Sequence, residues 1–226
     1  MKKIISYSLW GNNERYTHGA LTNSELASEI YPDWICRFYI GKSVPDDIIK
    51  SLKKKDNTQL ILMNKPGDWY SMFWRFLPAS DSNVDVMISR DCDSRLTVRE
   101  RAAVEEWLKS DKLFHIMRDH PYHKTEILGG MWGVKKPLLS EMKEMIEKYR
   151  IGNFWQVDQN FLREKVYPMV KDQAMVHDEF FSNKPFPYAR DDKHFVGQAY
   201  SGDDKILDGD EYFIDRIKET IDASPR

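Results

Sequence analysis

Cysteine is scarce in this 226-residue chain, which has only Cys36 and Cys92. Two cysteines cannot build a disulfide framework, so we expect reduced, packed thiols in a cytoplasmic protein. Long apolar runs are also missing, since no stretch approaches the ~18 residues of a membrane span. The apolar segment at residues 4–9 is too short for a signal-peptide core. We therefore expect neither a secreted disulfide-rich domain nor a membrane span.

An excess of charge of one sign is absent as well, because 34 Lys and Arg residues face 36 Asp and Glu residues, for a formal net charge of −2. The chain thus lacks the basic field that suits a nucleic-acid backbone, and we predict no nucleic-acid partner. Low-complexity linkers and internal repeats are not found either. A chain of this length can bury one large core, so we predict a single domain over residues 1–226.

What the sequence does contain is an alternation of strand-like and helix-like segments. Predicted strands cover residues 3–9, 34–40, 59–63, 84–88 and 113–117. Predicted helices run from the capping sequence Thr22–Glu25 to Pro32, and over residues 44–55, 68–76, 97–109, 137–149 and 153–167. This alternation predicts an α/β fold, with a mostly parallel central sheet flanked by helices. Ligands of such sheets bind at the carboxyl ends of the strands.

The most informative stretch is an apolar strand that leads directly into two aspartates. Residues 84–88 are rich in β-branched side chains, and Asp91 and Asp93 follow, between Arg90 and Arg95. In extended backbone the two aspartates project the same way, and they repel each other unless a cation lies between them. Proteins bind Mg²⁺ or Mn²⁺ in this manner, together with the phosphates of a substrate. Because arginines form bidentate hydrogen bonds with phosphate oxygens, Arg90 and Arg95 fit the same prediction of a metal–diphosphate site.

A third aspartate is predicted to point inward from the helix over residues 153–167. The apolar face of that helix is formed by Val157, Phe161, Leu162 and Val166. Asp158 lies four residues before Leu162 and so points toward this face. Because a buried carboxylate needs a partner or a task, two interpretations remain. Asp158 either hydrogen-bonds a neighbouring loop or acts beside a reacting group.

Six separated motifs, in order along roughly residues 1–200, carry a resemblance to a known family. They are Ser8–Asn13, Met72–Phe76, Ser89–Leu96, His115–Pro121, Gly129–Gly133 and Asp158–Gln159. The pattern resembles glycosyltransferases of the GT-A fold that use a nucleotide sugar, and more narrowly the glycosyltransferase domain of large chlorella viruses and its bacterial relatives. The resemblance implies a single-domain, Rossmann-like GT-A fold. It also implies a viral or bacterial source, and the host cytoplasm if the source is viral.

The resemblance implies a division of the chain and roles for its first half. Residues 1–96 would form a nucleotide-binding half, residues 97–200 a donor-sugar and acceptor half, and residues 201–226 a C-terminal tail. The loop after the first strand would hold the base and ribose through Ser8, Leu9 and Trp10. The two aspartates of the Asp-x-Asp motif would hold Mn²⁺ or Mg²⁺ on the diphosphate, and Arg75 would lie near the donor.

The segment at residues 118–133 would shape the sugar and acceptor site by the same resemblance. The candidate contacts in it are Asp119, His120, Gly129, Gly130 and Trp132. The aspartate and the histidine could hydrogen-bond sugar hydroxyls, while glycines let a sugar approach the backbone closely. A tight turn and an exposed histidine are the structural alternatives.

Two further questions stay open at the level of the sequence. The third metal ligand is either His177, after a short apolar strand, or His194, in a stretch that resembles the His-x-x-Gly of bacterial galactosyltransferases. The resemblance of Asp158 and Gln159 to a pair beside the reacting sugar in retaining enzymes implies retention. An inverting enzyme would instead need a general base, for which Asp119 and Glu126 are candidates.

The sequence thus predicts a metal-dependent glycosyltransferase that moves a sugar from a nucleotide sugar, by resemblance a UDP-sugar, to a glycan acceptor hydroxyl. One alternative is a haloacid-dehalogenase-like phosphotransferase, which also places Asp-x-Asp after an apolar strand. That motif continues to a threonine where this chain has Arg95, and it follows the first strand rather than a later one. The other alternative is a non-catalytic sugar- or nucleotide-binding module with the same three aspartates.

Overall fold

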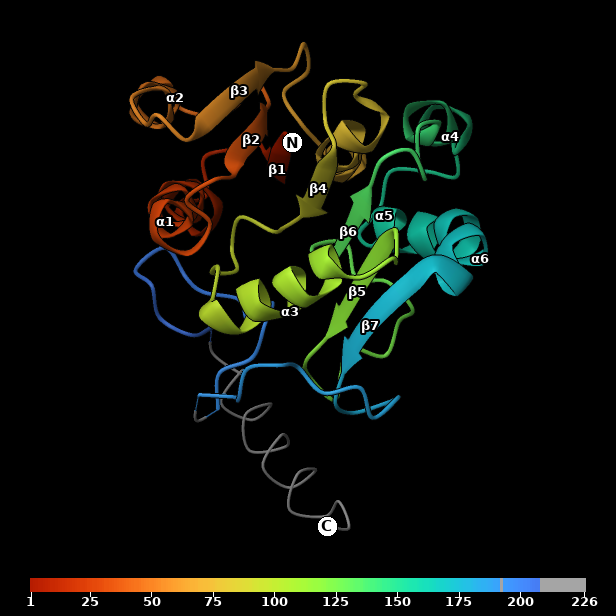
Figure 1. Ribbon diagram of the computed structural model, residues 1–226. Coiled ribbons are helices and arrows are strands. Elements are labelled where there is room, and N and C mark those ends of the chain that lie inside the picture. The colour runs from red at the N-terminus through yellow and green to blue at the C-terminus, as the bar shows by residue number, and fades with distance from the viewer. Residues whose placement is uncertain (192, 208–226) are drawn as a thin grey trace.

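Seven strands form one sheet with helices on both faces (Figure 1) in the computed structural model, which describes residues 1–191 and 193–207. The strands are β1 (Lys3–Leu9), β2 (Ile35–Ile40), β3 (Thr58–Leu62), β4 (Val86–Ser89), β5 (Phe114–Arg118), β6 (Trp132–Lys135) and β7 (Ala174–Asp178). Their order in the sheet is β3-β2-β1-β4-β6-β5-β7. Strand β6 is antiparallel to β4 and β5, and the other pairings are parallel. The predicted mostly parallel sheet is confirmed.

Helical segments connect most of these strands. The α-helices are α1 (Glu14–Ile30), α2 (Asp46–Lys53), α3 (Val98–Lys109), α4 (Met142–Lys148), α5 (Val157–Phe161) and α6 (Tyr167–Val170). The 3₁₀ segments are η1 (Trp69–Ser80) and η3 (Lys171–Gln173), and η2 (Leu162–Val166) is π-helical.

Every helix in the described part of the chain is too short or too polar to cross a bilayer.

Two hydrophobic cores lie on opposite faces of the sheet. Helices α1, α2 and α3 cover one face, over a core that includes Tyr7 and Trp107. Segment η1 and helices α4 to α6 cover the other face, over a core that includes Phe73, Trp132 and Phe161 (Figure 1). Successive side chains of a strand face opposite sides, so the same strands supply both cores. The sheet is therefore held rigidly from both sides, which fixes the positions of the loops at its edges.

The start predicted for the first helix is wrong. Helix α1 begins at Glu14, eight residues before the predicted capping sequence at Thr22, and Asn13 caps it by accepting the N–H of Arg15 at 3.0 Å. Thr22 lies inside the helix, and Asn23 is wholly buried. Helix α1 therefore starts directly after the loop that follows β1.

Two later segments also differ from the prediction. Residues 132–135 form strand β6, which a glycine and a length of four residues conceal in the sequence. The helix predicted over residues 153–167 begins only at Val157, after Gln156 with φ of 69°, and passes through the π-helical η2. The helix predicted over residues 137–149 is shortened to α4. The other predicted strands and helices agree with the structure to within a few residues.

The carboxyl ends of β1, β4, β5 and β7 lie on one edge of the sheet, because these strands run in the same direction. In Figure 1 the arrows of β4, β5 and β7 point to the lower edge, where the blue C-terminal segment crosses. The antiparallel β6 starts at this same edge. The loops at residues 10–13, 90–95 and 119–131 consequently meet there.

Candidate functional site

A cavity of about 460 Å³ opens at this edge, where the ends of β1 and β4 meet the start of α5. Its wall includes the carboxylates of Asp91, Asp93 and Asp158 and the guanidinium groups of Arg15 and Arg75. The structure thus brings the Asp-x-Asp motif and Asp158 together, as the resemblance implies.

Arg75, on η1, connects two of these carboxylates. Its Nη1 donates to Asp91 Oδ1 at 2.6 Å, and its Nη2 donates to Asp158 Oδ2 at 2.7 Å. Arg75 is held from β1, because the hydroxyl of Ser8 accepts the backbone N–H of Arg75 and donates to the carbonyl of Met72. Arg75 and Asp158 are only 6% and 1% exposed. One buried cation therefore joins β4 to α5 through η1.

Burial shifts the pKa values of Arg75 and Asp158. Burial lowers the pKa of the Arg75 guanidinium, but Asp91 and Asp158 more than offset that effect and raise the pKa overall. Burial raises the pKa of Asp158 above its ordinary 3.8, and Arg75 opposes the rise. Asp158 Oδ1 also accepts the N–H of Gln159 at 2.9 Å. Arg75 thus favours the ionised form of Asp158, against the effect of burial.

Asp93 is held from the opposite side, where it forms an ion pair with Arg15 of α1. Helix α1 approaches the Asp-x-Asp loop closely because Gly19 has no side chain, and a Cβ there would lie 2.0 Å from the carbonyl oxygen of Cys92. The buried amide of Asn23 donates to the same carbonyl at 3.2 Å. Contacts from helix α1 therefore hold the loop that carries Asp91 and Asp93 in place.

The cavity carries an excess of negative charge. Burial raises the pKa of Asp93, Asp91 raises it further, and Arg15 opposes the rise. When all groups are ionised, three carboxylates against two guanidinium groups leave one net negative charge. The side chains of Asp91 and Asp93 are 42% and 14% exposed, so their oxygens remain accessible. These hard oxygen donors fit Mg²⁺ or Mn²⁺, with ligand phosphates and water completing the coordination.

The loop after β1 forms the wall next to α1. Trp10 lines the cavity, and Gly67, with φ of 112°, lets the chain pass beside it, since a Cβ at Gly67 would lie 2.2 Å from Trp10 Cβ. Ser8 also lines the cavity, although its hydroxyl is engaged by η1. The side chain of Leu9 is wholly buried in the core under α1, which corrects its predicted contact with a nucleotide.

The glycines before β6 make room for the protein's own side chains. A Cβ at Gly129 would lie 2.4 Å from Arg75 Nη2 and 2.6 Å from Asp158 Oδ2, and one at Gly130 would lie 2.0 Å from Asp91 Oδ2. Gly129 lines the cavity, but Gly130 does not. The absence of these side chains makes room for the protein's own Arg75 and its carboxylates.

The two arginines that flank the Asp-x-Asp motif lie outside the cavity. Arg90 is 2% exposed and donates from Nε to Glu100 of α3 at 3.0 Å. Arg95 donates to Asp204 of the C-terminal segment at 2.7 Å. The prediction that they bind phosphate is corrected, since one faces the α3 side of the sheet and the other is paired with a carboxylate. The arginines that do lie beside the aspartates are Arg15 and Arg75.

Three candidate sugar contacts also lie outside the cavity wall. Asp119 is wholly buried, where Arg99 and Arg190 donate to it at 2.7–2.9 Å. His120 is 3% exposed, and its Nδ1 accepts a neighbouring backbone N–H. Trp132 is a wholly buried core residue stacked on another aromatic ring. Because the side chains of all three are buried and do not line the cavity, these predictions are corrected.

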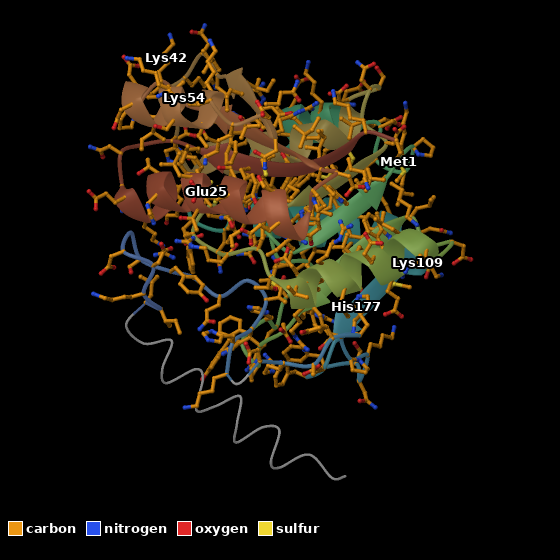
Figure 2. All side chains as sticks on the ribbon, turned by 60° about the vertical axis from the view of Figure 1, so that its left-hand side comes forward. Met1, Glu25, Lys42, Lys54, Lys109 and His177 are labelled. Atoms are coloured by element: carbon orange, nitrogen blue, oxygen red, sulfur yellow. The ribbon has the colours of Figure 1, made fainter. Side chains whose placement is uncertain are left out.

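Neither predicted histidine ligand reaches the aspartates. His177 is 3% exposed beside α3 (Figure 2), where its Nδ1 lies 2.8 Å from His115 Nε2 and its Nε2 lies 3.4 Å from Glu106. His194 is exposed and bonds Gln198. Over residues 1–191 and 193–207, no group of three or more His, Cys, Asp or Glu side chains is placed to hold a metal ion. The geometry contradicts a histidine ligand at both positions.

The cavity residues that the sequence reasoning missed include Arg15, Trp69, His123 and Trp155. The rings of Trp69 and Trp155 are 46% and 65% exposed at the cavity, and Asn153 ties their segments together by accepting a backbone N–H of η1 at 3.0 Å. An exposed tryptophan has no signature in a single sequence. Arg15 was concealed by the misplaced start of α1.

Among solved structures, the fold is similar to that of a glycosyltransferase involved in the glycosylation of the major capsid of PBCV-1. The TM-score is 0.53 at 15% identity, over 80% of this chain and 82% of that one. A mannosyltransferase from Pyrobaculum calidifontis, in complex with GDP-Man and Mn²⁺, gives 0.51 at 11% identity. That match covers 79% of this chain and 55% of the mannosyltransferase, so the chain spans about half the length of that protein.

The fold is not restricted to glycosyl transfer. A 4-diphosphocytidyl-2C-methyl-D-erythritol synthase from Anaerococcus prevotii gives a TM-score of 0.50 at 16% identity, over 83% of this chain and 93% of that one. No protein-family model matches the chain. No curated protein matches it either. The chain therefore has the GT-A, Rossmann-like fold that its motifs resemble, and its activity has to be argued from the site.

Arg75→Met should destabilise the protein by about 3 kcal/mol at neutral pH, because it leaves the buried Asp158 without its cation. The folded-state pKa of Asp158 is already raised above the unfolded value and would rise further without Arg75. A raised pKa favours folding at low pH and disfavours it as the pH rises through the folded pKa, so the loss should shrink in acid. Urea unfolding at several pH values measures this.

The matched control is Arg150→Met, at an exposed arginine, which should change the free energy of unfolding by less than about 0.5 kcal/mol. Asp158→Asn in the Arg75→Met background should recover part of the loss, because an amide needs no cation. An Arg75→Met protein as stable as the wild type at neutral pH would show that the shared cation is unimportant.

Proposed function

We propose that the chain is a metal-dependent glycosyltransferase that moves a sugar from a nucleotide-sugar donor, with UDP as its nucleotide, to a hydroxyl of a glycan acceptor with retention. The observation that carries the proposal is Asp158, a buried carboxylate in the wall of the same cavity as Asp91 and Asp93. Two carboxylates suit a metal diphosphate, and the third is available for the reacting sugar. The motif resemblance and the GT-A fold support the same activity.

The nucleotide would lie between the β1 loop and α1. Trp10 offers an aromatic surface to the base, and the N-terminus of α1, with Asn12 and Asn13 on the cavity wall, favours an anion. Arg15 and Arg75 add positive charge on either side of the aspartates. The diphosphate would therefore meet two guanidinium groups and the positive end of a helix.

Asp91 and Asp93 are the residues that would hold Mn²⁺ or Mg²⁺, and the bound ion would neutralise charge on the departing diphosphate as a Lewis acid. Arg75 contacts both Asp91 and Asp158, so it couples the diphosphate end of the site to the sugar end. Asp158 would stabilise the positive charge that develops on the sugar as its bond to the diphosphate breaks. Its orientation is held by Arg75 and by the N–H of Gln159.

Retention is favoured because, in the described part of the chain, the cavity wall has no carboxylate beyond Asp91, Asp93 and Asp158 that could act as a general base. Asp119 is enclosed by two arginines, and Glu126 is not among the residues that line the cavity. Within the described residues, the carboxylates of the wall are Asp91, Asp93 and Asp158. Both oxygens of Asp158 accept hydrogen bonds, which suits charge stabilisation better than proton removal.

The acceptor is proposed to be a sugar because of the aromatic rim. Trp69 and Trp155 present exposed rings to the cavity, and Gln156 and Gln159 add amide groups beside them. Sugars combine apolar C–H faces with hydroxyl groups, and aromatic rings next to amides match both. The remaining open surface of the cavity thus suits a glycan hydroxyl.

The alternatives receive less support from the site. Strand β4 is the fourth strand along the chain, and Asp91 Oδ1 is bound to Arg75, which disfavours the nucleophilic aspartate of a haloacid-dehalogenase-like phosphotransferase. A non-catalytic module has no need for a buried Asp158. Incubation with UDP-, GDP- and dTDP-sugars and Mn²⁺ tests the proposal. Release of nucleoside diphosphate supports it, and release of pyrophosphate or inorganic phosphate, or no turnover with any donor and acceptor, contradicts it.

Asp93→Asn should weaken Mn²⁺-dependent binding of UDP at least about tenfold, the range seen when the surroundings of a bound metal are altered. Binding measured without Mn²⁺ should change little, because the nucleotide then contacts mainly the loop after β1 and α1. Calorimetry of UDP binding with and without Mn²⁺ measures both values.

Asp111→Asn is the matched control, since Asp111 is exposed and lies outside the cavity. It should leave both affinities unchanged. Equal UDP affinity of the wild type with and without Mn²⁺ would overturn the metal assignment, and thermal unfolding of both variants shows that they remain folded.

Asp158→Asn should lower turnover by about 100-fold or more while leaving UDP affinity nearly intact, because the carboxylate acts mainly in the transition state. Asn160→Ala is the control, at a position three residues after the start of α5 that does not line the cavity. NMR of the first-formed glycoside reports the anomeric configuration. A configuration opposite to that of the donor would rule out retention.

A further inference from the structure

His123 lies in the cavity wall, in the connection between β5 and β6. Its ring is half-buried, with Phe195 and His120 at centroid distances of 5.8 and 5.6 Å. The backbone N–H of Asp119 donates to Nδ1 of His123 at 3.0 Å. Asp119 is itself fixed by a buried ion-pair network, so it holds the imidazole rigidly.

This hydrogen bond determines which nitrogen carries the proton. Because Nδ1 accepts, the neutral ring must carry its proton on Nε2. Burial, with smaller contributions from His120, Arg190 and Arg118, lowers the pKa of His123 to about 3. The ring is therefore uncharged at neutral pH, and it offers an N–H donor at Nε2.

The donor at Nε2 is free to meet a ligand. Within residues 1–191 and 193–207, Nε2 of His123 has no hydrogen-bond partner, and it is not among the unpaired atoms that are shut off from solvent. Since the residue lines the cavity, a ligand there can reach it. A donor held this rigidly costs little further ordering when it binds an oxygen.

The order of the strands indicates which part of a donor lies at His123. Along the sheet edge, the loop after β1 comes first, then the Asp-x-Asp loop after β4, and then the connection from β5 to β6 that carries His123. A nucleotide sugar has the same order of parts: base, diphosphate and sugar. If the diphosphate lies at Asp91 and Asp93, the sugar extends toward His123, Leu128 and Gly129.

We propose that His123 donates a hydrogen bond from Nε2 to an oxygen of the transferred sugar and so contributes to the choice of donor sugar. This inference rests on the proposed glycosyltransferase function. The group recognised is a hydroxyl or ring oxygen of a hexose. A neutral N–H donor can bind such an uncharged oxygen, but it lacks the positive charge that would favour a phosphate. His123 is thus a specificity residue rather than a metal ligand or a proton-transfer group.

The tautomer is tested first, on the free protein. In ¹⁵N-histidine NMR, His123, assigned with a His123→Gln sample, should show the neutral Nε2–H form from pH 5 to 8. The Nδ1–H form or an imidazolium in this range would overturn the proposal. This readout needs no substrate, so it does not depend on the proposed function.

The ligand contact is tested with UDP-glucose, UDP-galactose and GDP-mannose, each compared with its free nucleoside diphosphate in Mn²⁺. Phe at position 123 keeps a ring of similar size but has no N–H, whereas the amide of Gln places a donor near the Nε2 position. His123→Phe should weaken the nucleotide sugar that binds the wild type by about five- to tenfold, as expected for one lost hydrogen bond, and leave the nucleoside diphosphate unchanged. His123→Gln should restore part of the difference.

The possible outcomes separate the two proposals. Equal loss for the nucleotide sugar and the nucleoside diphosphate, or no loss for either, would overturn the role of His123 while leaving the glycosyltransferase function intact. Failure of the wild type to bind any of these nucleotides would overturn the proposed function, and the role of His123 with it. A selective loss with His123→Phe that His123→Gln reverses would support the inference.

Discussion

The ion pairs of Arg75 are the contact on which the candidate site depends. One buried guanidinium group satisfies Asp91 at the end of β4 and Asp158 at the start of α5, and these residues come from distant parts of the chain. Without the cation, two carboxylates would repel each other across a poorly solvated space. The pairing therefore explains why an acidic site forms in a folded protein, and why Gly129 and Gly130, which leave room for it, have no side chains.

The other aspartate of the motif is also paired with a cation. Asp93 is balanced by Arg15 from α1, which Gly19 and Asn23 bring against the loop. The balance is incomplete, because one negative charge remains when all five groups are ionised. A site that is preorganised by cations yet short of one positive charge is suited to recruit a divalent ion together with its anionic ligand. The same fold hosts different transfer reactions among solved structures, so this arrangement of charges, rather than the sheet, is what indicates an activity.

Buried polar networks decide which residues of the loop between β5 and β6 face the cavity. Asp119 is enclosed by Arg99 and Arg190, and its backbone N–H in turn orients His123. A sequence-based choice favoured Asp119 and His120 as sugar contacts, but Asp119 is wholly buried in ion pairs with Arg99 and Arg190, and His120 is 3% exposed. Residue type alone does not reveal which of several neighbouring polar side chains is paired internally.

The sequence alone determined the α/β class, the mostly parallel sheet and, through its motifs, the similarity to the GT-A fold. Local periodicity and short motifs, which adjacent residues encode, determine these features, whereas a common site for Asp91, Asp93 and Asp158 was implied only by the family resemblance. Only the tertiary structure decided which arginines pair with those aspartates. It also placed Arg90 against Glu100 of α3, and His177 beside the same helix. Partners of this kind come from residues that are distant in the chain, and their choice depends on side-chain direction and burial, which periodicity does not record.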